Sequence, residues 1–365
     1  MTSTPVFLPR KELAHLFDAL RADGRRIVGP TVVDGAVIYD ELTSPTELPT
    51  GIRADTGPGR YRLSGEGGLR AFDYTVGVTS WKRFNHPPIV PLTRSRRDGD
   101  RTIVEAVAED PPRLAYLGVR GCELAAIGIQ DRAMRAGPLG DASHAERSDA
   151  ALIVGVECAV AASTCFCTSM GTGPGIEEGR GADVVLAELD DGFVVRAETA
   201  AGRRVVEQLE LRPAADGQVQ MAAQQVSTLG AAMGDPVPTT GLPERLRAAL
   251  DHPRWDEVAE RCLACANCTL VCPTCFCTSV GVASDLDGQS AATERTWDSC
   301  FSLGFGRVAG DANFRPKTRD RYRQWLTHKF STWWDQFGSS GCVGCGRCIA
   351  WCPVGIDVRE ELLAI

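Results

Sequence analysis

Eight cysteines near the C-terminus stand in two runs of identical spacing. The chain has 365 residues and 15 cysteines. The two runs read Cys262-Leu-Ala-Cys265-Ala-Asn-Cys268-Thr-Leu-Val-Cys272-Pro273 and Cys342-Val-Gly-Cys345-Gly-Arg-Cys348-Ile-Ala-Trp-Cys352-Pro353. The spacing C-x2-C-x2-C-x3-C-P is typical of thiolates that hold cubane iron–sulfur clusters. A tight loop at this spacing can present three thiolates to three corners of one cubane, so two copies predict two [4Fe–4S] clusters.

The fourth cysteine of each run is expected on the short helix that follows, where it points away from its own loop and reaches the cluster of the other run. One cluster is then expected to take Cys262, Cys265, Cys268 and Cys352. The other is expected to take Cys342, Cys345, Cys348 and Cys272. Gly344 and Gly346 let the backbone approach the inorganic core closely.

Two other uses of clustered cysteines fit the sequence less well. A disulfide framework is typical of small secreted domains, whereas this chain is long and begins without the charged, apolar and small-residue order of a secretory signal. Structural zinc usually binds two separated cysteine pairs, whereas each run here places three cysteines within seven residues and a fourth beyond them. The two runs are therefore expected to bind iron–sulfur clusters rather than to form disulfides or bind zinc.

Seven further cysteines lie outside the two runs, and four of them are in the N-terminal region. One further cubane needs that number of thiolates, so we expect a third [4Fe–4S] cluster bound by Cys122, Cys158, Cys165 and Cys167. Two near-identical sequences, Thr164-Cys-Phe-Cys-Thr-Ser169 and Thr274-Cys-Phe-Cys-Thr-Ser279, leave alternatives open. Either Cys275, Cys277 and Cys300 contribute to that cluster or hold another, or the Cys-Phe-Cys segments are reduced thiols packed beside the ferredoxin-like core.

The sequence contains no recognisable motif for catalysis on a substrate. The five histidines are widely separated, no G-x-S-x-G nucleophile sequence is present, and no glycine-rich segment has the spacing and context of a dinucleotide site. We therefore expect no catalytic residue in this chain. A formal net charge of −8 gives no indication of nucleic-acid binding, and no long apolar stretch predicts a membrane span. We expect a cytoplasmic protein.

The elements that must position these cysteines fall into two regions. Residues 1–240 are expected to form a mixed α/β domain, and residues 243–365 a mainly helical domain containing a ferredoxin-like module with two [4Fe–4S] clusters, which makes the fold class α+β. A Pro/Gly/Thr-rich stretch, residues 233–243, is the expected linker. Apolar runs predict strands at 26–29, 36–39, 114–119, 151–156 and 183–189, a hairpin from the last of these to 193–198, and helices at 11–20, 123–134, 243–250 and 254–261.

A basic, aromatic-containing segment lies between the two cysteine runs, at residues 315–330. It alternates Arg319, Arg321 and Arg323 with Tyr322 and Trp325. In an acidic chain, such a segment is more typical of a solvated face or a subunit-docking surface than of a nucleic-acid site.

Several longer sequence segments resemble those of a known protein family, and the resemblance covers most of the chain. They are Trp81-Lys-Arg-Phe-Asn-His-Pro-Pro88, Gly118-Val-Arg-Gly-Cys122-Glu-Leu-Ala-Ala-Ile127, Cys165-Phe-Cys167-Thr-Ser-Met-Gly-Thr-Gly-Pro174, Cys272-Pro-Thr-Cys275-Phe-Cys277, Trp297-Asp-Ser-Cys300, Asn313-Phe-Arg-Pro316 and Gly341-Cys-Val-Gly-Cys-Gly-Arg-Cys348. In these segments the chain resembles the beta subunit of cytoplasmic NAD(P)-linked [NiFe] hydrogenases, the sulfhydrogenases, and the related iron–sulfur component of anaerobic sulfite reductase. Gly121 and Glu123 depart from the proline or alanine and the aspartate usual in the family.

The resemblance implies an iron–sulfur electron-transfer subunit without catalysis of its own. Its implied partners are a flavin subunit that binds NAD(P) and the small and large subunits of a [NiFe] hydrogenase. The alternative is the same role in a sirohaem sulfite reductase. A free-standing flavin enzyme and a zinc-binding adaptor are competing classes that metal and flavin analysis would distinguish.

Overall fold

A computed structural model describes residues 4–65, 68–108 and 110–365. Within these residues the main sheet has eight strands in the order β12-β1-β11-β10-β9-β8-β2-β3. The four central strands, β10, β9, β8 and β2, pair in parallel with one another. The pairs β12–β1, β1–β11, β11–β10 and β2–β3 are antiparallel. The strands are β1 Val6–Pro9, β2 Arg26–Val33, β3 Ala36–Glu41, β8 Leu114–Val119, β9 Leu152–Val156, β10 Val184–Glu188, β11 Gly192–Ala197 and β12 Arg212–Pro213.

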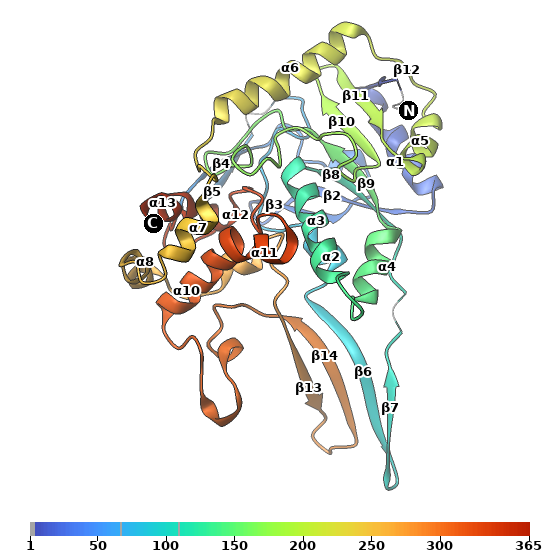
Figure 1. Cartoon of the computed structure of the whole chain (residues 1–365). Coiled ribbons are helices and arrows are strands. Elements are labelled where there is room, and N and C mark those ends of the chain that lie inside the picture. Colours follow the sequence, from blue (N-terminus) through green and yellow to red (C-terminus); the bar gives the residue numbers. More distant parts are fainter. Residues whose placement is uncertain (1–3, 66–67, 109) are drawn as a thin grey trace.

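Helices cover both faces of the main sheet (Figure 1). On one face, α1 and α5 pack over a core that includes Phe17, Leu117 and Val205. On the other face, α3 packs Leu124 and Ile127 against Tyr116 and neighbouring aromatic side chains. Strand β8 therefore buries alternate residues against the two layers, as expected for a central strand. The helices of this region are α1 Leu13–Ala22, α2 Lys82–Asn85, α3 Gly121–Met134, α4 Ala142–Ala150, α5 Ala200–Glu207 and α6 Asp216–Met233, with one-turn helices η1 Arg10–Glu12 and η2 Pro45–Glu47.

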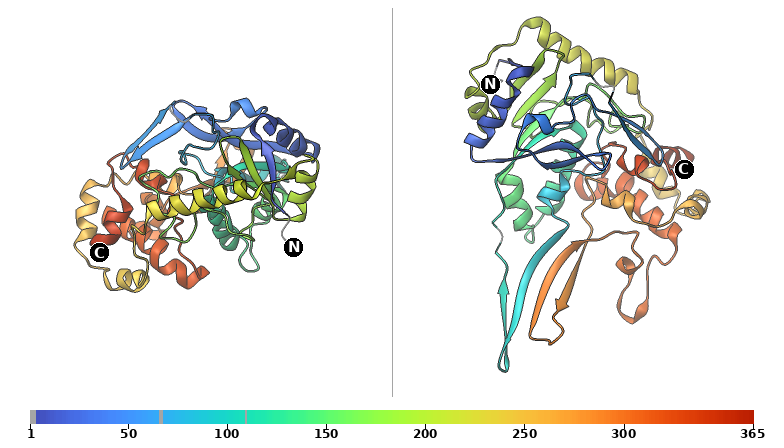
Figure 2. Two further views of the ribbon diagram at one scale, coloured as in Figure 1. Left: turned by 90° about the horizontal axis from the view of Figure 1, so that it is seen from above. Right: turned by 180° about the vertical axis from the view of Figure 1, so that it is seen from behind.

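A second sheet joins segments that are far apart in the sequence. It consists of β6 Ile89–Asp98, β7 Arg101–Ala106, β13 Thr278–Ser284 and β14 Ser290–Trp297, in the order β13-β14-β6-β7. All its pairs are antiparallel, and β14 lies directly beside β6. This sheet, which we call the arm, extends away from the rest of the molecule (Figures 1 and 2). A small hairpin, β4 Arg53–Gly57 with β5 Arg60–Ser64, lies near the C-terminal helices.

Short helices surround the two cysteine runs in the C-terminal region. They pack around a core that contains Trp255, Phe301, Tyr322, Trp325 and Ile349. Their bounds are α7 Leu242–Ala248, α8 Arg254–Arg261, α9 Asn267–Leu270, η3 Leu303–Gly306, η4 Ala309–Asp311, α10 Thr318–Thr327, the π-helix η5 His328–Thr332, α11 Trp333–Phe337, α12 Arg347–Ala350 and α13 Val358–Ala364. No helix within the described part of the chain combines the length and apolarity that a membrane span requires.

The structure confirms a mixed α/β architecture with the expected strands and the β10–β11 hairpin. The expected linker lies between α6 and α7. The arm was not expected, and it pairs strands from both sides of that linker, so the division at residues 240 and 243 stays a prediction. In the basic segment, Tyr322 and Trp325 are buried core residues and Arg321 is 8% exposed; the expectation of a solvated face or docking surface is therefore wrong for these three side chains.

Candidate iron–sulfur sites

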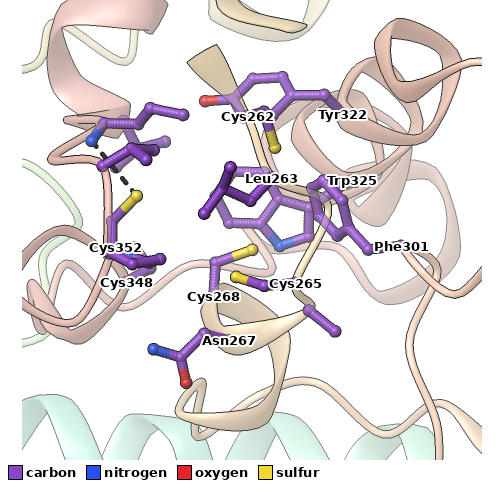
Figure 3. A pocket seen from close by; sticks show the side chains of 15 residues that line it. Cys262, Leu263, Cys265, Asn267, Cys268, Phe301, Tyr322, Trp325, Cys348 and Cys352 are labelled. Atoms are coloured by element: carbon purple, nitrogen blue, oxygen red, sulfur yellow. Dashed lines mark hydrogen bonds between the residues drawn. The ribbon is translucent and has the colours of Figure 1, made fainter.

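The first predicted ligand set surrounds one apolar cavity. Cys262, Cys265 and Cys268 follow α8, Cys352 follows α12, and all four line this first cavity. Figure 3 shows sulfur atoms from both runs facing the same space, with Tyr322 and Trp325 at its wall. The structure thus brings together the four side chains that the crossed pattern predicts. The fourth cysteines were expected on the short helices, but α9 ends at Leu270 and α12 at Ala350, so both lie just beyond.

The second predicted ligand set surrounds a neighbouring cavity. Cys272, Cys342, Cys345 and Cys348 line this second cavity together with Phe166 and Lys329, among others. Backbone N–H groups donate to ligand sulfurs at both cavities: Ala264 N to Cys262 Sγ (3.4 Å), Gly344 N to Cys342 Sγ (3.4 Å) and Ile356 N to Cys352 Sγ (3.3 Å). Such bonds stabilise the negative charge of cluster thiolates and help set cluster potentials.

The third predicted ligand set also meets at one cavity. Cys122, Cys158, Cys165 and Cys167 line this third cavity with Tyr74, Arg120 and Met233. Cys122 lies in the first turn of α3, directly after β8, and Cys158 follows β9. The carboxyl ends of adjacent parallel strands meet at one edge of a sheet, which is where such folds usually place ligands. The main sheet therefore positions two of the four thiols, and the Cys165–Cys167 loop supplies the others.

The three cavities are contiguous. Cys348 lines both the first and the second cavity, and Cys345 lines both the second and the third. The order is therefore first, second, third, with the second in the middle. Within the described residues, no group of three or more His, Cys, Asp or Glu side chains is placed to hold a single metal ion; each set of four cysteines is instead spread around the wall of a cavity, as a multi-iron cluster requires.

Burial controls the ionisation of these thiols. Burial raises the pKa of Cys165 and of Cys342 to about 12, and it raises the pKa of Cys122 well above its ordinary value. Cys272 differs, because a hydrogen bond from Cys275, assisted by the nearby Lys329 ammonium, holds the pKa of Cys272 well below the ordinary value. Iron binds thiolates, so loading the buried sites releases protons.

A buried ion pair, not expected from the sequence, connects the second and third sites. Arg347, which precedes Cys348, forms an ion pair with Glu123, which follows Cys122, and the two side chains are 0% and 1% exposed. Glu123 also accepts hydrogen bonds from Tyr39 Oη at 2.8 Å and Trp81 Nε1 at 3.1 Å. Arg347 Nε donates to Gly77 O at 3.0 Å. In the sequence, this neighbourhood was marked only by the family-like segments that contain Trp81, Glu123 and Arg347.

Two buried lysines were also missed. Lys329 Nζ donates to Thr274 Oγ1 at 2.9 Å and to Gly341 O at 3.2 Å. Lys82 Nζ lies 3.3 Å from Leu270 O and 3.7 Å from the centre of the Trp297 ring. Both lysines are 4% exposed. Among the cysteines, Cys272 and Cys275 interact most strongly with both ammonium groups and act to raise the pKa of each lysine. A lysine in a polar segment normally indicates a surface, so sequence pattern alone could not find them.

Comparison with known proteins agrees with this arrangement. A 4Fe-4S dicluster domain family matches residues 261–356, which contain both runs. The chain is 32% identical over 360 residues to sulfhydrogenase 2 subunit beta of Pyrococcus furiosus (strain ATCC 43587 / DSM 3638 / JCM 8422 / Vc1), covering 96% of each chain. No solved structure matches the chain. The likeness extends over the N-terminal region, the arm and the dicluster domain, and the chain therefore belongs to the sulfhydrogenase beta-subunit family of iron–sulfur proteins.

Proposed function

We propose that this chain is the electron-transfer subunit that relays single electrons between a flavin subunit that oxidises NAD(P)H and the [NiFe] hydrogenase small and large subunits, in the cytoplasm. The observation that carries the proposal is the unbroken series of three cavities, each lined by all four cysteines of one predicted set. The named relative is a sulfhydrogenase subunit. That likeness does not favour the alternative of a sulfite reductase subunit.

We propose the ligand sets Cys262, Cys265, Cys268 and Cys352; Cys272, Cys342, Cys345 and Cys348; and Cys122, Cys158, Cys165 and Cys167. When bound, [4Fe–4S] clusters accept and release one electron each, at potentials that the protein tunes. The chain's own residues do the rest. Phe166, Trp325 and Phe330 exclude water from the second cavity, and the N–H groups of Ala264, Gly344 and Ile356 stabilise thiolate charge.

Counting iron and acid-labile sulfide in the anaerobically purified chain tests the ligand sets. We expect about twelve irons and twelve sulfides per chain, since each cubane holds four of each. About eight would remove the third site, and zinc in place of iron would contradict the proposal as a whole.

The relay itself is tested in the complete complex. We expect Cys342→Ser to abolish NAD(P)H-dependent hydrogen production while the hydrogenase subunits keep their activity with an artificial one-electron donor. Cys300→Ser, at a cysteine outside the three cavities, is the matched control for loss of a thiol. An unchanged NAD(P)H-dependent rate in Cys342→Ser would rule the relay out.

A further inference from the structure

A buried lysine lies beside the middle site of the series. Lys329 belongs to the π-helix η5, where it is buried together with Phe330 and Ser331, and it lines the second cavity. Single π-helical turns are rare and occur frequently at functional sites. Gly341 N donates to Lys329 O at 2.7 Å. The backbone that carries Lys329 is therefore joined directly to the start of the second run.

The ammonium group of Lys329 is bonded to uncharged groups. Its Nζ donates to Thr274 Oγ1 at 2.9 Å and to Gly341 O at 3.2 Å, and it lies 5.8 Å from the centre of the Trp333 ring. A buried cation requires negative charge nearby. A cubane bound by four thiolates is an anion, and all four cysteines of the second predicted set line the same cavity as Lys329. The second site, when loaded, supplies the missing counter-charge.

Thr274 connects this ammonium group to a predicted cluster ligand. Its buried Oγ1 lies 2.6 Å from Gly341 O and 3.2 Å from Cys272 Sγ. A threonine hydroxyl has one proton to donate, and a thiolate at Cys272 accepts but cannot donate. Because Lys329 also donates to Gly341 O, the Thr274 hydroxyl is free to donate to the Cys272 thiolate. Each hydrogen bond in the series Lys329, Thr274, Cys272 then strengthens the next.

The middle position gives this series of hydrogen bonds a task. Cys348 lines the first and second cavities, and Cys345 lines the second and third. The second site therefore has a neighbouring site on each side, whereas the first and third sites have one neighbour each. Like charges repel strongly in a protein interior, where the effective dielectric constant is low. With all three sites loaded, an added electron is opposed most strongly at the middle one unless a positive charge offsets the repulsion.

We propose that Lys329 and Thr274 are positioning residues that raise the reduction potential of the second cluster, so that electrons can pass through the middle of the relay. This inference rests on the proposed function and deepens it. The positive charge of Lys329 favours the reduced state of the second site. The Thr274 hydroxyl, polarised by Lys329, stabilises negative charge on Cys272 Sγ, and hydrogen bonds to cluster sulfurs are among the factors that set cluster potentials.

The test is a redox titration of the full chain, purified anaerobically with its iron and followed by EPR spectroscopy. Sodium dithionite and soluble mediators supply the electrons. Cys265 lines the first cavity and Cys122 the third, so the midpoints lost in Cys265→Ser and Cys122→Ser identify the first and third clusters. The remaining midpoint belongs to the second cluster.

Lys329→Met removes the charge and keeps an unbranched side chain. We expect it to lower the midpoint of the second cluster by at least about 59 mV, a tenfold change in a one-electron equilibrium constant, and to shift the other two midpoints less. Lys329→Arg keeps the charge and is expected to restore at least half of the loss. An unchanged second midpoint in iron-replete Lys329→Met would overturn the proposal, and so would a loss in Lys329→Arg as large as in Lys329→Met.

Thr274→Val keeps the shape of the side chain and removes the hydroxyl. We expect it to lower the same equilibrium constant at least twofold, but by less than Lys329→Met. The matched control is Thr164→Val, at the corresponding position of the near-identical segment, because the Thr164 hydroxyl lies 3.4 Å from Thr56 Oγ1. If Lys329→Met fails to retain iron, these two variants decide, and equal second midpoints in them would overturn the proposal.

The titration separates this proposal from the relay itself, because it needs neither partner subunits nor NAD(P)H. A complete complex that produced no hydrogen from NAD(P)H would contradict the relay and leave the shift in Lys329→Met intact. Conversely, a second midpoint that ignored Lys329 in a complex that did produce hydrogen would contradict the role of Lys329 and leave the relay intact.

Discussion

The two cysteine runs have the same spacing but opposite surroundings. In the first run, Cys265 is exposed and Leu263 is 63% exposed. In the second run, Cys345 is 8% exposed, and it lines both the second and third cavities. The first run thus borders solvent, and the second lies in the middle of the molecule. The cysteine spacing predicts what each run binds. The residues between the cysteines determine whether the run fits at the surface or in the interior of the molecule.

The residues between the cysteines differ in a way that fits this placement. Equivalent positions are Ala264 and Ala266 in the first run and Gly344 and Gly346 in the second, and all four have positive φ angles, between 50° and 74°. A Cβ on Gly344 would lie 2.4 Å from Phe166 O, and one on Gly346 would lie 2.4 Å from Thr164 O. The second run needs glycine because the Cys165–Cys167 loop packs directly on it.

The next position differs as well. Asn267 of the first run donates from Nδ2 to Trp351 O, which joins the two runs to each other. Arg347 of the second run is buried and pairs with Glu123 instead. At this position the first run is therefore bonded to the second run, whereas the second run forms an ion pair with α3 of the N-terminal region.

The largest expected difference between the runs is in iron content. Cys345→Ser is expected to lose about eight irons, because the altered side chain lines two cavities, whereas Cys265→Ser is expected to lose about four. Iron and sulfide analysis of the two anaerobic variants measures this. Equal losses would show that the middle position of the second run has no structural consequence.

Breaking the Arg347–Glu123 pair should be the next largest effect. Glu123→Gln leaves the Arg347 guanidinium buried without its counter-charge, which typically costs about 3–5 kcal/mol. The free energy of unfolding of the anaerobic chain, from denaturant titration, measures the loss. Glu177→Gln is the matched control, since the Glu177–Arg180 pair is exposed and such pairs contribute little. A loss no greater than the control's would mean that the pair does not hold the second run.

A smaller cost is expected for Gly346→Ala. The added Cβ meets Thr164 O and must also adopt a left-handed conformation, so we expect destabilisation of about 2–3 kcal/mol. Gly338→Ala separates the two causes, because Gly338 has a φ of 66° and nothing within 4 Å of the added Cβ. The same denaturant titration applies, and equal costs in the two variants would exclude the close approach of the Cys165–Cys167 loop as a cause.

The reciprocal change in the first run should be slightly favourable. Ala266 has a φ of 66°, a conformation that glycine adopts without strain, and the gain is partly offset by the greater freedom of glycine in the unfolded chain. Ala266→Gly is therefore expected to stabilise the chain by at most about 1 kcal/mol. A clear destabilisation would mean that the alanine methyl group makes a contact that the first run needs.

The sequence predicted those parts of the molecule that follow a regular pattern. The central strands carry apolar runs because they are buried on both faces. The grouping of the cysteines around three cavities was predicted from their spacing and from the number of N-terminal cysteines, and their role as cluster ligands stays a prediction. Helix α6 was missed because Ala222 is its one buried residue among those described, which leaves no apolar stripe. The arm was missed because β7 and β13 are largely exposed and show no alternation.

The remaining misses are charged residues in the interior. Glu123, Arg347, Lys82 and Lys329 are of types usually found on surfaces, and their burial depends on partners that lie far away in the sequence. Glu123 and Arg347, for example, are separated by 224 residues. No local pattern records such a partnership, so these residues could be found only after the fold had brought them together.

The pairing of β14 with β6 has a consequence for synthesis of the chain. Strand β6 ends at Asp98 and β14 begins at Ser290, so a ribosome must make most of the protein before the arm can close. Until then one edge of β6 is unpaired, and unpaired edges are where nascent chains associate wrongly. Contacts between such distant segments also form slowly. In the proposed ligand sets the first and second sites both take cysteines of the second run, Cys352 in the first and Cys342, Cys345 and Cys348 in the second. Insertion of iron and sulfide into these two sites would accordingly wait for nearly complete translation, because the second run is made last.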